Sequence, residues 1–121
     1  MTLNEIVAGT MSTSEDGEYL TVAKTTDLGE DAHKLISIGG RKVLLCRSEN
    51  QYFAVQNTCT HDMEPLTGGA IRKCTIVCPM HGARFSLKSG QPFGPPAFEP
   101  LDTYEVRIEG ELIQVWSKPK T

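Results

Sequence analysis

Apolar and polar residues alternate along most of this chain, in short runs that are separated by turn-forming residues. A period of two places one face of a strand against a core and the other face against water. No segment of ten or more residues has a 3.6-residue period, so the pattern predicts an all-β protein. The expected strands cover residues 19–23, 34–38, 43–46, 52–55, 76–77, 103–108 and 112–116.

Turn-forming residues between these runs predict how the strands connect. Gly39-Gly40 lies between two apolar runs and predicts a tight hairpin turn, because glycine adopts left-handed backbone conformations freely. Glu49-Asn50 and Glu109-Gly110 predict turns of the same kind. Residues 27–34 have room for a single helical turn and no more.

Three stretches interrupt the β pattern and predict loops. Residues 57–69 and 78–84 have few β-branched residues and are rich in glycine, proline and side chains that bind metals. Residues 90–100 contain four prolines, which cannot donate hydrogen bonds to a strand ladder. The chemistry of this chain is therefore expected in its loops.

Length and charge limit the possible functions. A chain of 121 residues predicts one domain, and its formal net charge of −3 argues against a nucleic-acid partner. The same charge is compatible with weak docking to proteins that carry basic patches. Neither a secretory signal nor a membrane span is recognisable, which predicts a cytoplasmic protein with no membrane partner. In that compartment four cysteines are expected to be ligands or buried thiols rather than two disulfides.

The most informative motif consists of two matched pairs of ligand-type residues. Cys59-Thr60-His61 is followed, after sixteen residues, by Cys78-Pro79-Met80-His81. The first spacing is too tight for a zinc-finger knuckle. A 2Fe–2S cluster can use two cysteines on one iron and two histidines on the other, so each loop would give one ligand to each iron. A zinc site with the same four residues remains an alternative.

With these residues the chain resembles the Rieske family, and the similarity extends beyond the ligands. Gly68-Gly69 follows the first box, Gly82 follows the second, and Pro95-Pro96-Ala97 resembles the proline loop that shields the cluster. The resemblance implies a Rieske fold, in which antiparallel β-sheets form a basal sandwich below a small cluster-binding subdomain of two ligand loops. It covers residues 19–116, with the cluster-binding part at about 57–98. It leaves residues 1–18 as an N-terminal extension and 117–121 as a tail.

The resemblance is closest to the ferredoxin components of bacterial aromatic ring-hydroxylating oxygenase systems. Respiratory Rieske proteins have a disulfide and two hydroxyl donors at positions that correspond here to Glu64, Met80, Ala83 and Phe85. Two missing donors would lower the reduction potential by roughly 100–250 mV. The resemblance thus implies a low-potential electron carrier, not itself an enzyme, that shuttles between a flavoprotein ferredoxin reductase using NADH or NADPH and a terminal oxygenase.

The same resemblance assigns roles around the cluster. Cys59 and Cys78 would hold the inner iron, and His61 and His81 would hold the outer iron and form the electron exit. A shuttle that offers one small face to two partners predicts a monomer. A small subunit of another reductase, such as nitrite reductase, is an alternative. The sequence context of Cys46, in an apolar run, predicts a structural thiol. Cys74 is expected to be a structural thiol too, although it lies four residues before Cys78 and could be a spare ligand. His33 lies in a polar turn and is expected to be solvated. The expected docking surface consists of His61, His81, Asp62, Met63, Glu64, Met80, Pro95 and Pro96.

Overall fold

The computed structural model describes residues 17–120, so most of the predicted N-terminal extension lies outside the described residues. Within that range the chain forms nine strands and one short 3-10 helix. No helix in this part is long and apolar enough to cross a membrane. The elements are β1 (Tyr19–Lys24), η1 (Thr25–Asp27), β2 (His33–Ile38), β3 (Arg41–Ser48), β4 (Gln51–Gln56), β5 (Ala70–Arg72), β6 (Thr75–Val77), β7 (Arg84–Ser86), β8 (Thr103–Glu109) and β9 (Leu112–Pro119).

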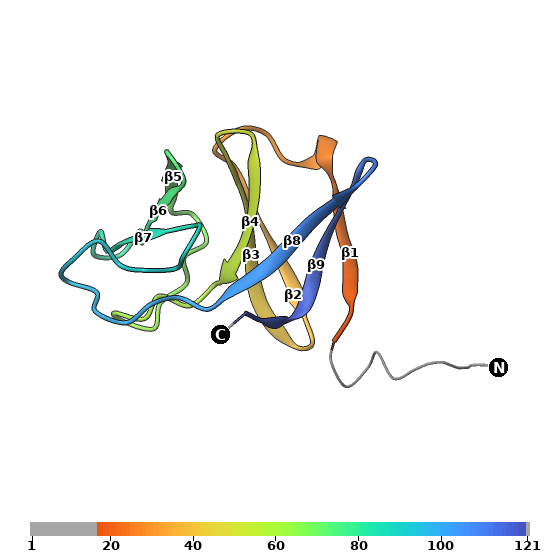
Figure 1. Cartoon of the computed structure of the whole chain (residues 1–121). Coiled ribbons are helices and arrows are strands. Elements are labelled where there is room, and N and C mark those ends of the chain that lie inside the picture. Colours follow the sequence, from red (N-terminus) through yellow and green to blue (C-terminus); the bar gives the residue numbers. More distant parts are fainter. Residues whose placement is uncertain (1–16, 121) are drawn as a thin grey trace.

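The larger sheet has six antiparallel strands in the order β1-β9-β8-β4-β3-β2. It curls, so that its two halves face each other across a core (Figure 1). Ala23 of β1 and Ile38 of β2 belong to that core although their strands are the two edges of the sheet. The curled sheet is the basal sandwich that the sequence predicts.

The smaller sheet is made of β5, β6 and β7 and lies to one side of the larger sheet (Figure 1). One face of this sheet, with Ile71, Ile76 and Phe85, is buried against β3 and β4. The buried residues between the small sheet and strands β3 and β4 form a second core, which also contains Cys59 and Cys78. The predicted ligand cysteines are therefore anchored in packed apolar surroundings.

The hairpin turns follow from backbone conformation. Gly39 and Gly40 have φ of 56° and 82°, and Glu49 and Asn50 have φ of 51° and 61°. Positive φ at both central residues suits the twist of a two-residue hairpin. Because Glu49 is not a glycine, this conformation is unfavourable there. The Glu30 carboxylate offsets part of the cost by accepting hydrogen bonds from both turn N–H groups, at 2.6 and 3.2 Å.

All seven expected strands are present, but several boundaries were wrong. β5 and β7 were not predicted, because they have three residues each and, unlike β6, are not runs of β-branched residues. Arg84 begins β7 and therefore does not belong to the predicted loop. The expected helical turn at residues 27–34 is instead η1, and His33 begins β2. The last turn consists of Gly110 and Glu111, and β9 continues to Pro119, into the predicted tail.

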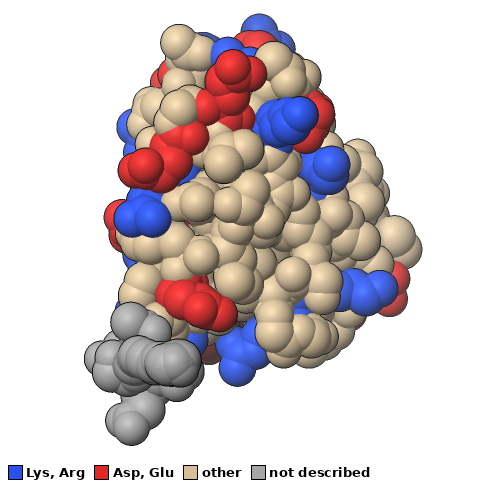
Figure 2. Space-filling view, turned by 90° about the vertical axis from the view of Figure 1, so that its right-hand side faces the viewer, with Lys and Arg blue, Asp and Glu red and all other residues tan. Residues whose placement is uncertain are grey.

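Charged side chains on the face opposite the small sheet are of both signs. Figure 2 shows this face, where basic and acidic groups lie beside one another, mostly around an uncharged centre. Mixed charges of this kind give the face no strong preference for a charged partner.

Candidate metal centre

Two loops with the same hydrogen-bond scheme present the candidate ligands. The first ligand loop, residues 57–69, connects β4 to β5, and the second, residues 78–83, connects β6 to β7. In the first, the Cys59 N–H donates to the Glu64 carbonyl and the Cys59 carbonyl accepts from Met63, both at 2.8 Å. In the second, Cys78 makes the equivalent bonds with Ala83 and Gly82, at 2.7 and 3.0 Å. Each cysteine thus closes a turn of the same size.

Both turns contain a left-handed residue four positions after the cysteine. In the second loop it is Gly82, with φ of 76°, as its glycine suggests. In the first loop it is Met63, with φ of 62°, which the sequence did not reveal. A non-glycine residue in this region costs free energy of order 1–3 kcal/mol, so the surrounding bonds must hold it there.

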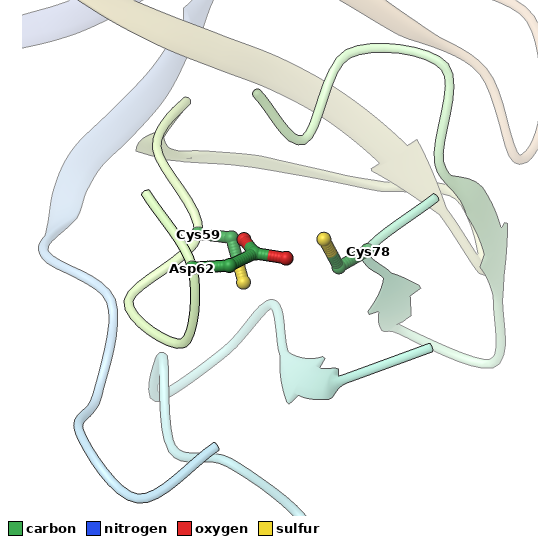
Figure 3. A group of neighbouring side chains, drawn as sticks. All are labelled: Cys59, Asp62 and Cys78. Atoms are coloured by element: carbon green, nitrogen blue, oxygen red, sulfur yellow. The ribbon is translucent and has the colours of Figure 1, made fainter. Parts of the chain in front are cut away.

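The two thiols lie at the buried side of the site. Cys59 and Cys78 are 0% and 1% exposed, and together with Asp62 they place their ligand atoms within 4.8 Å of one another. Figure 3 shows the two sulfurs and the carboxylate pointing into the same gap between the loops. Burial raises the pKa of the Cys59 thiol to about 11, an effect that N–H groups of His61 and Asp62 partly counter. A bound cation must therefore displace a proton from this thiol.

The two imidazoles lie at the exposed side. His61 and His81 have ring centroids 5.5 Å apart and rings nearly perpendicular, at 88°. Their ligand atoms also lie within 4.8 Å of an Asp62 oxygen. The His81 side chain is 59% exposed. The site therefore has a buried thiol pair and an exposed imidazole pair.

Asp62 lies between these pairs, which corrects its expected place on the docking surface. Its side chain is only 15% exposed, and one oxygen lies 2.7 Å from His81 Nδ1. The other oxygen accepts from the Glu64 N–H at 3.1 Å. Desolvation alone would raise the pKa of Asp62, but hydrogen bonds from His81, the Glu64 N–H and Cys59 together lower it. This carboxylate must turn aside when a larger group binds between the ligand pairs.

The donor set fits a 2Fe–2S cluster of the Rieske type. Such a cluster needs two thiolates on one iron and two imidazoles on the other, and the four side chains are sorted in this way. Cys74, the possible spare ligand, is not among the grouped ligands, and its thiol lies 3.7 Å from the Ser48 carbonyl. Cys46 is fully buried, so both are structural thiols in the described structure.

The proline loop, residues 90–100, packs against the first ligand loop. The Thr60 hydroxyl donates to the Glu99 carbonyl at 2.7 Å, and Ala97 is 1% exposed within the core that contains both ligand cysteines. Gly90 is fixed to Leu101, whose N–H donates to the Gly90 carbonyl at 2.8 Å. The loop thus covers the site from a third side.

His33 is not in a polar turn, as was expected, but in β2. Its Nε2 accepts a hydrogen bond from the Gly68 N–H at 3.1 Å. The side chain therefore links the basal sheet to the first ligand loop. A histidine that precedes an alternating run gives no signal of such a distant contact.

Large apolar side chains are exposed on the two ligand loops and on the proline loop. Met63 and Met80 are 73% and 55% exposed. Phe98 and Phe93 of the proline loop are 77% and 54% exposed, and neither was predicted. The sequence feature that could have revealed them is the presence of two phenylalanines in a proline-containing loop, where side chains tend to be exposed. Glu64 and Pro95 are exposed as expected, and Pro96 is half-buried.

Respiratory Rieske proteins have two hydroxyl donors and a disulfide beside the cluster, and this chain has neither at the corresponding positions. Ala83 and Phe85 are both fully buried and have no hydroxyl to donate. All four cysteines are free, and Glu64 and Met80 are exposed and cannot form a disulfide.

Several known proteins are similar to this chain in sequence and in structure. Residues 18–105 match the family profile of the Rieske [2Fe-2S] domain. Ferredoxin CarAc of Metapseudomonas resinovorans is 30% identical over 96 residues, which are 78% of this chain and 90% of the relative. The biphenyl 2,3-dioxygenase ferredoxin component of Rhodococcus jostii (strain RHA1) is 32% identical over 77 residues, 64% of this chain and 72% of the relative.

Solved structures agree. The ferredoxin of carbazole 1,9a-dioxygenase from Nocardioides aromaticivorans IC177 superimposes with a TM-score of 0.79 at 27% identity, covering 83% of this chain and 98% of that one. A complex of reduced oxygenase and oxidized ferredoxin in carbazole 1,9a-dioxygenase gives 0.80 at 27% identity, with 85% and 96% covered. With this match, the fold and the paired ligands, the chain belongs to the Rieske [2Fe-2S] domain family, whose cofactor is one Rieske-type 2Fe–2S cluster.

Proposed function

We propose that this protein is the ferredoxin of an aromatic ring-hydroxylating oxygenase system. It takes single electrons from an NAD(P)H-dependent flavoprotein reductase and passes them to a terminal Rieske non-haem iron oxygenase. The observation that carries the proposal is a site with buried thiols and exposed imidazoles, on a domain too small for a second metal centre. The similarity to ferredoxin components over most of their length supports it.

Under this proposal each ligand has a distinct task. Cys59 and Cys78 hold the inner iron inside the core, where water does not reach. His61 and His81 hold the outer iron and connect it to the surface. The bound cluster supplies a one-electron acceptor and donor. The ligand loops and the proline loop keep the protein atoms fixed around it, which reduces the rearrangement that accompanies a change of charge.

The apolar side chains beside the imidazoles are suited to brief contacts with two partners. Met63, Met80 and Phe98 can be desolvated by either partner without leaving a buried charge unpaired. Glu64, Pro95 and Pro96 complete the proposed docking surface at its edge. A monomer offers this surface to one partner at a time.

The proposed direction of electron flow rests on a low potential. Without hydroxyl donors at Ala83 and Phe85, the reduced and more negative state is less stabilised. A value at the low end of the Rieske range, which is about −150 to +300 mV, suits reduction by a flavoprotein. A redox titration that gives a potential above roughly +100 mV would contradict this direction.

The test combines spectroscopy with reconstitution. The purified holoprotein should be red-brown with about two irons per chain. After reduction with dithionite, its electron paramagnetic resonance spectrum should show the low average g-value expected of mixed histidine and cysteine ligation. A colourless protein with one zinc would support a binding module instead. A flavoprotein ferredoxin reductase and a terminal Rieske oxygenase should then turn over together only when this protein is added. Restored nitrite reduction in place of aromatic hydroxylation would favour the alternative, a small subunit of nitrite reductase.

A further inference from the structure

Charge is unevenly distributed along this acidic chain. Residues 65–98, which contain the small sheet and the second ligand loop, include four Lys or Arg residues and no Asp or Glu. The 15 acidic residues of the chain all lie outside this segment, although Asp62, Glu64 and Glu99 are close to its ends. The segment with the second ligand loop is therefore positive in a protein whose net charge is −3, whereas the first ligand loop carries Asp62 and Glu64.

Three of these cations form what we call the basic face: Arg72, Lys73 and Arg84. Alternation along β5 and β7 buries Ile71 and Phe85 and leaves Arg72 and Arg84 exposed on the opposite side of the small sheet. Lys73 is in the turn after β5 and is also exposed. The three side chains line a shallow hollow of about 390 Å³ whose other residues are uncharged: Ala70, Thr75 and Val77.

Among residues 17–120, no ion pair within 4.0 Å joins Arg72, Lys73 or Arg84 to an acidic side chain. The Glu49 carboxylate lies 3.6 Å from the thiol of Cys74, which directly follows Lys73, so this end of the basic face has an acidic group nearby. The opposite face of the molecule, shown in Figure 2, mixes both signs. Arg72 and Arg84 thus make no ion pair within the described fold.

The basic face adjoins the proposed electron exit. Val77, which lines its hollow, directly precedes Cys78, and Arg84 follows His81 by three residues. We propose that the basic face docks a carboxylate-bearing surface of a protein redox partner and so places that partner's redox centre beside His81. This inference rests on the proposed function of electron carriage, and it reverses the expectation, from net charge alone, that the partner surface is basic.

The sign of the salt dependence tests the electrostatic part. Ferricyanide is an anionic one-electron oxidant, and stopped-flow mixing with the dithionite-reduced holoprotein gives a second-order rate constant. If the basic face governs approach, the rate constant falls as ionic strength rises, because salt screens attraction. If the net charge of −3 governs, it rises instead, and the inference is overturned.

Two double variants separate local charge from total charge. R72E/R84E removes the basic face, whereas K24E/K34E reverses two exposed lysines on the larger sheet, and each lowers the formal net charge by the same four units. At low ionic strength R72E/R84E should react with ferricyanide about tenfold more slowly than K24E/K34E. Equal rates would overturn the inference. If R72E/R84E does not load its cluster, R72Q/R84Q takes its place with K24Q/K34Q as control, since each of these lowers the formal net charge by two units.

The protein partners decide whether the face is a docking surface. With the reductase and the oxygenase of the reconstituted system, R72E/R84E should slow electron transfer with at least one partner, and salt should remove the difference from K24E/K34E. If both variants exchange electrons with both partners at equal rates, the proposed docking role of the basic face is overturned, whereas the proposed function as an electron carrier is not affected. If the wild type exchanges electrons with neither partner, the proposed function itself fails.

Discussion

Replacing Gly69 by alanine should push the two ligand loops apart. A Cβ atom at this position would lie 2.2 Å from the Val77 carbonyl oxygen and 3.0 Å from that of Leu66. Real Cβ contacts are essentially never shorter than 3.0 Å, so the Val77 carbonyl and the first ligand loop must separate by about 0.8 Å. Val77 directly precedes Cys78, and Gly69 belongs to the loop that carries Cys59. The displacement therefore acts on the distance between the ligand pairs.

The expected loss has two parts. Overpacking of this kind costs about 1–3 kcal/mol of unfolding free energy, and each kcal/mol lowers Tm by roughly 4–8 °C in a domain of this size. Metal sites tolerate ligand displacements of only about 0.2 Å, so Gly69→Ala should contain less than roughly half the iron of the wild type. Iron and labile-sulfide assays and a thermal melt followed by circular dichroism measure the two parts.

Gly29→Ala is the matched control. Gly29 is exposed, has nothing within 4 Å of an added Cβ, and has no left-handed φ. The same change of one methyl group should there leave iron content unchanged and raise stability by about 0.4–1 kcal/mol at most. If Gly69→Ala matched Gly29→Ala in iron content and Tm, the close approach of the loops would not fix the ligand geometry.

Three further changes test other parts of the structure. Ala83→Ser and Phe85→Tyr should each raise the reduction potential by about 60–130 mV in a redox titration, and unchanged values would show that these hydroxyls do not reach the cluster. Burial raises the pKa of Cys46 from 9.0 to about 12, so between these values only the unfolded state ionises. In denaturant titrations above pH 9, the free energy of unfolding of the wild type should therefore fall by about 1.4 kcal/mol per pH unit relative to that of Cys46→Ala. If the two proteins lost stability equally with rising pH, the thiol would not be protected in the folded state. His33→Phe should cost about 0.5–1.5 kcal/mol of unfolding free energy through the lost hydrogen bond to Gly68, and an unchanged denaturant midpoint would contradict the contact between β2 and the first ligand loop.

The sequence predicted most of the fold because the longer strands are apolar runs or alternating segments between clear turn signals. β3 and β4 have runs of buried residues bounded by turn signals that fix both ends. β5 and β7 have three residues each and depend on pairing with β6, which is a tertiary interaction. Local pattern therefore failed only where local information is too short to specify a strand.

The candidate ligands were predictable because chemistry and spacing are properties of the sequence. The inward position of Asp62 was not predictable, because it depends on where the second loop places His81. The same is true of His33, whose partner Gly68 is 35 residues away. The exposure of Phe98 also depends on tertiary structure, because a hydrogen bond from Thr60 of the first ligand loop helps to position the proline loop.

The matched turns give a reason for the unequal spacing of the two boxes. Both cysteines close a turn with the same two hydrogen bonds, and both turns have a left-handed residue at the fourth position. The histidine, however, is two residues after Cys59 and three residues after Cys78. Because the turns are equivalent, that one-residue difference places the imidazoles on different parts of the turn, and their rings are nearly perpendicular rather than parallel. The two cysteines, by contrast, occupy the same position in both turns, so the one-residue offset distinguishes the histidine pair from the cysteine pair.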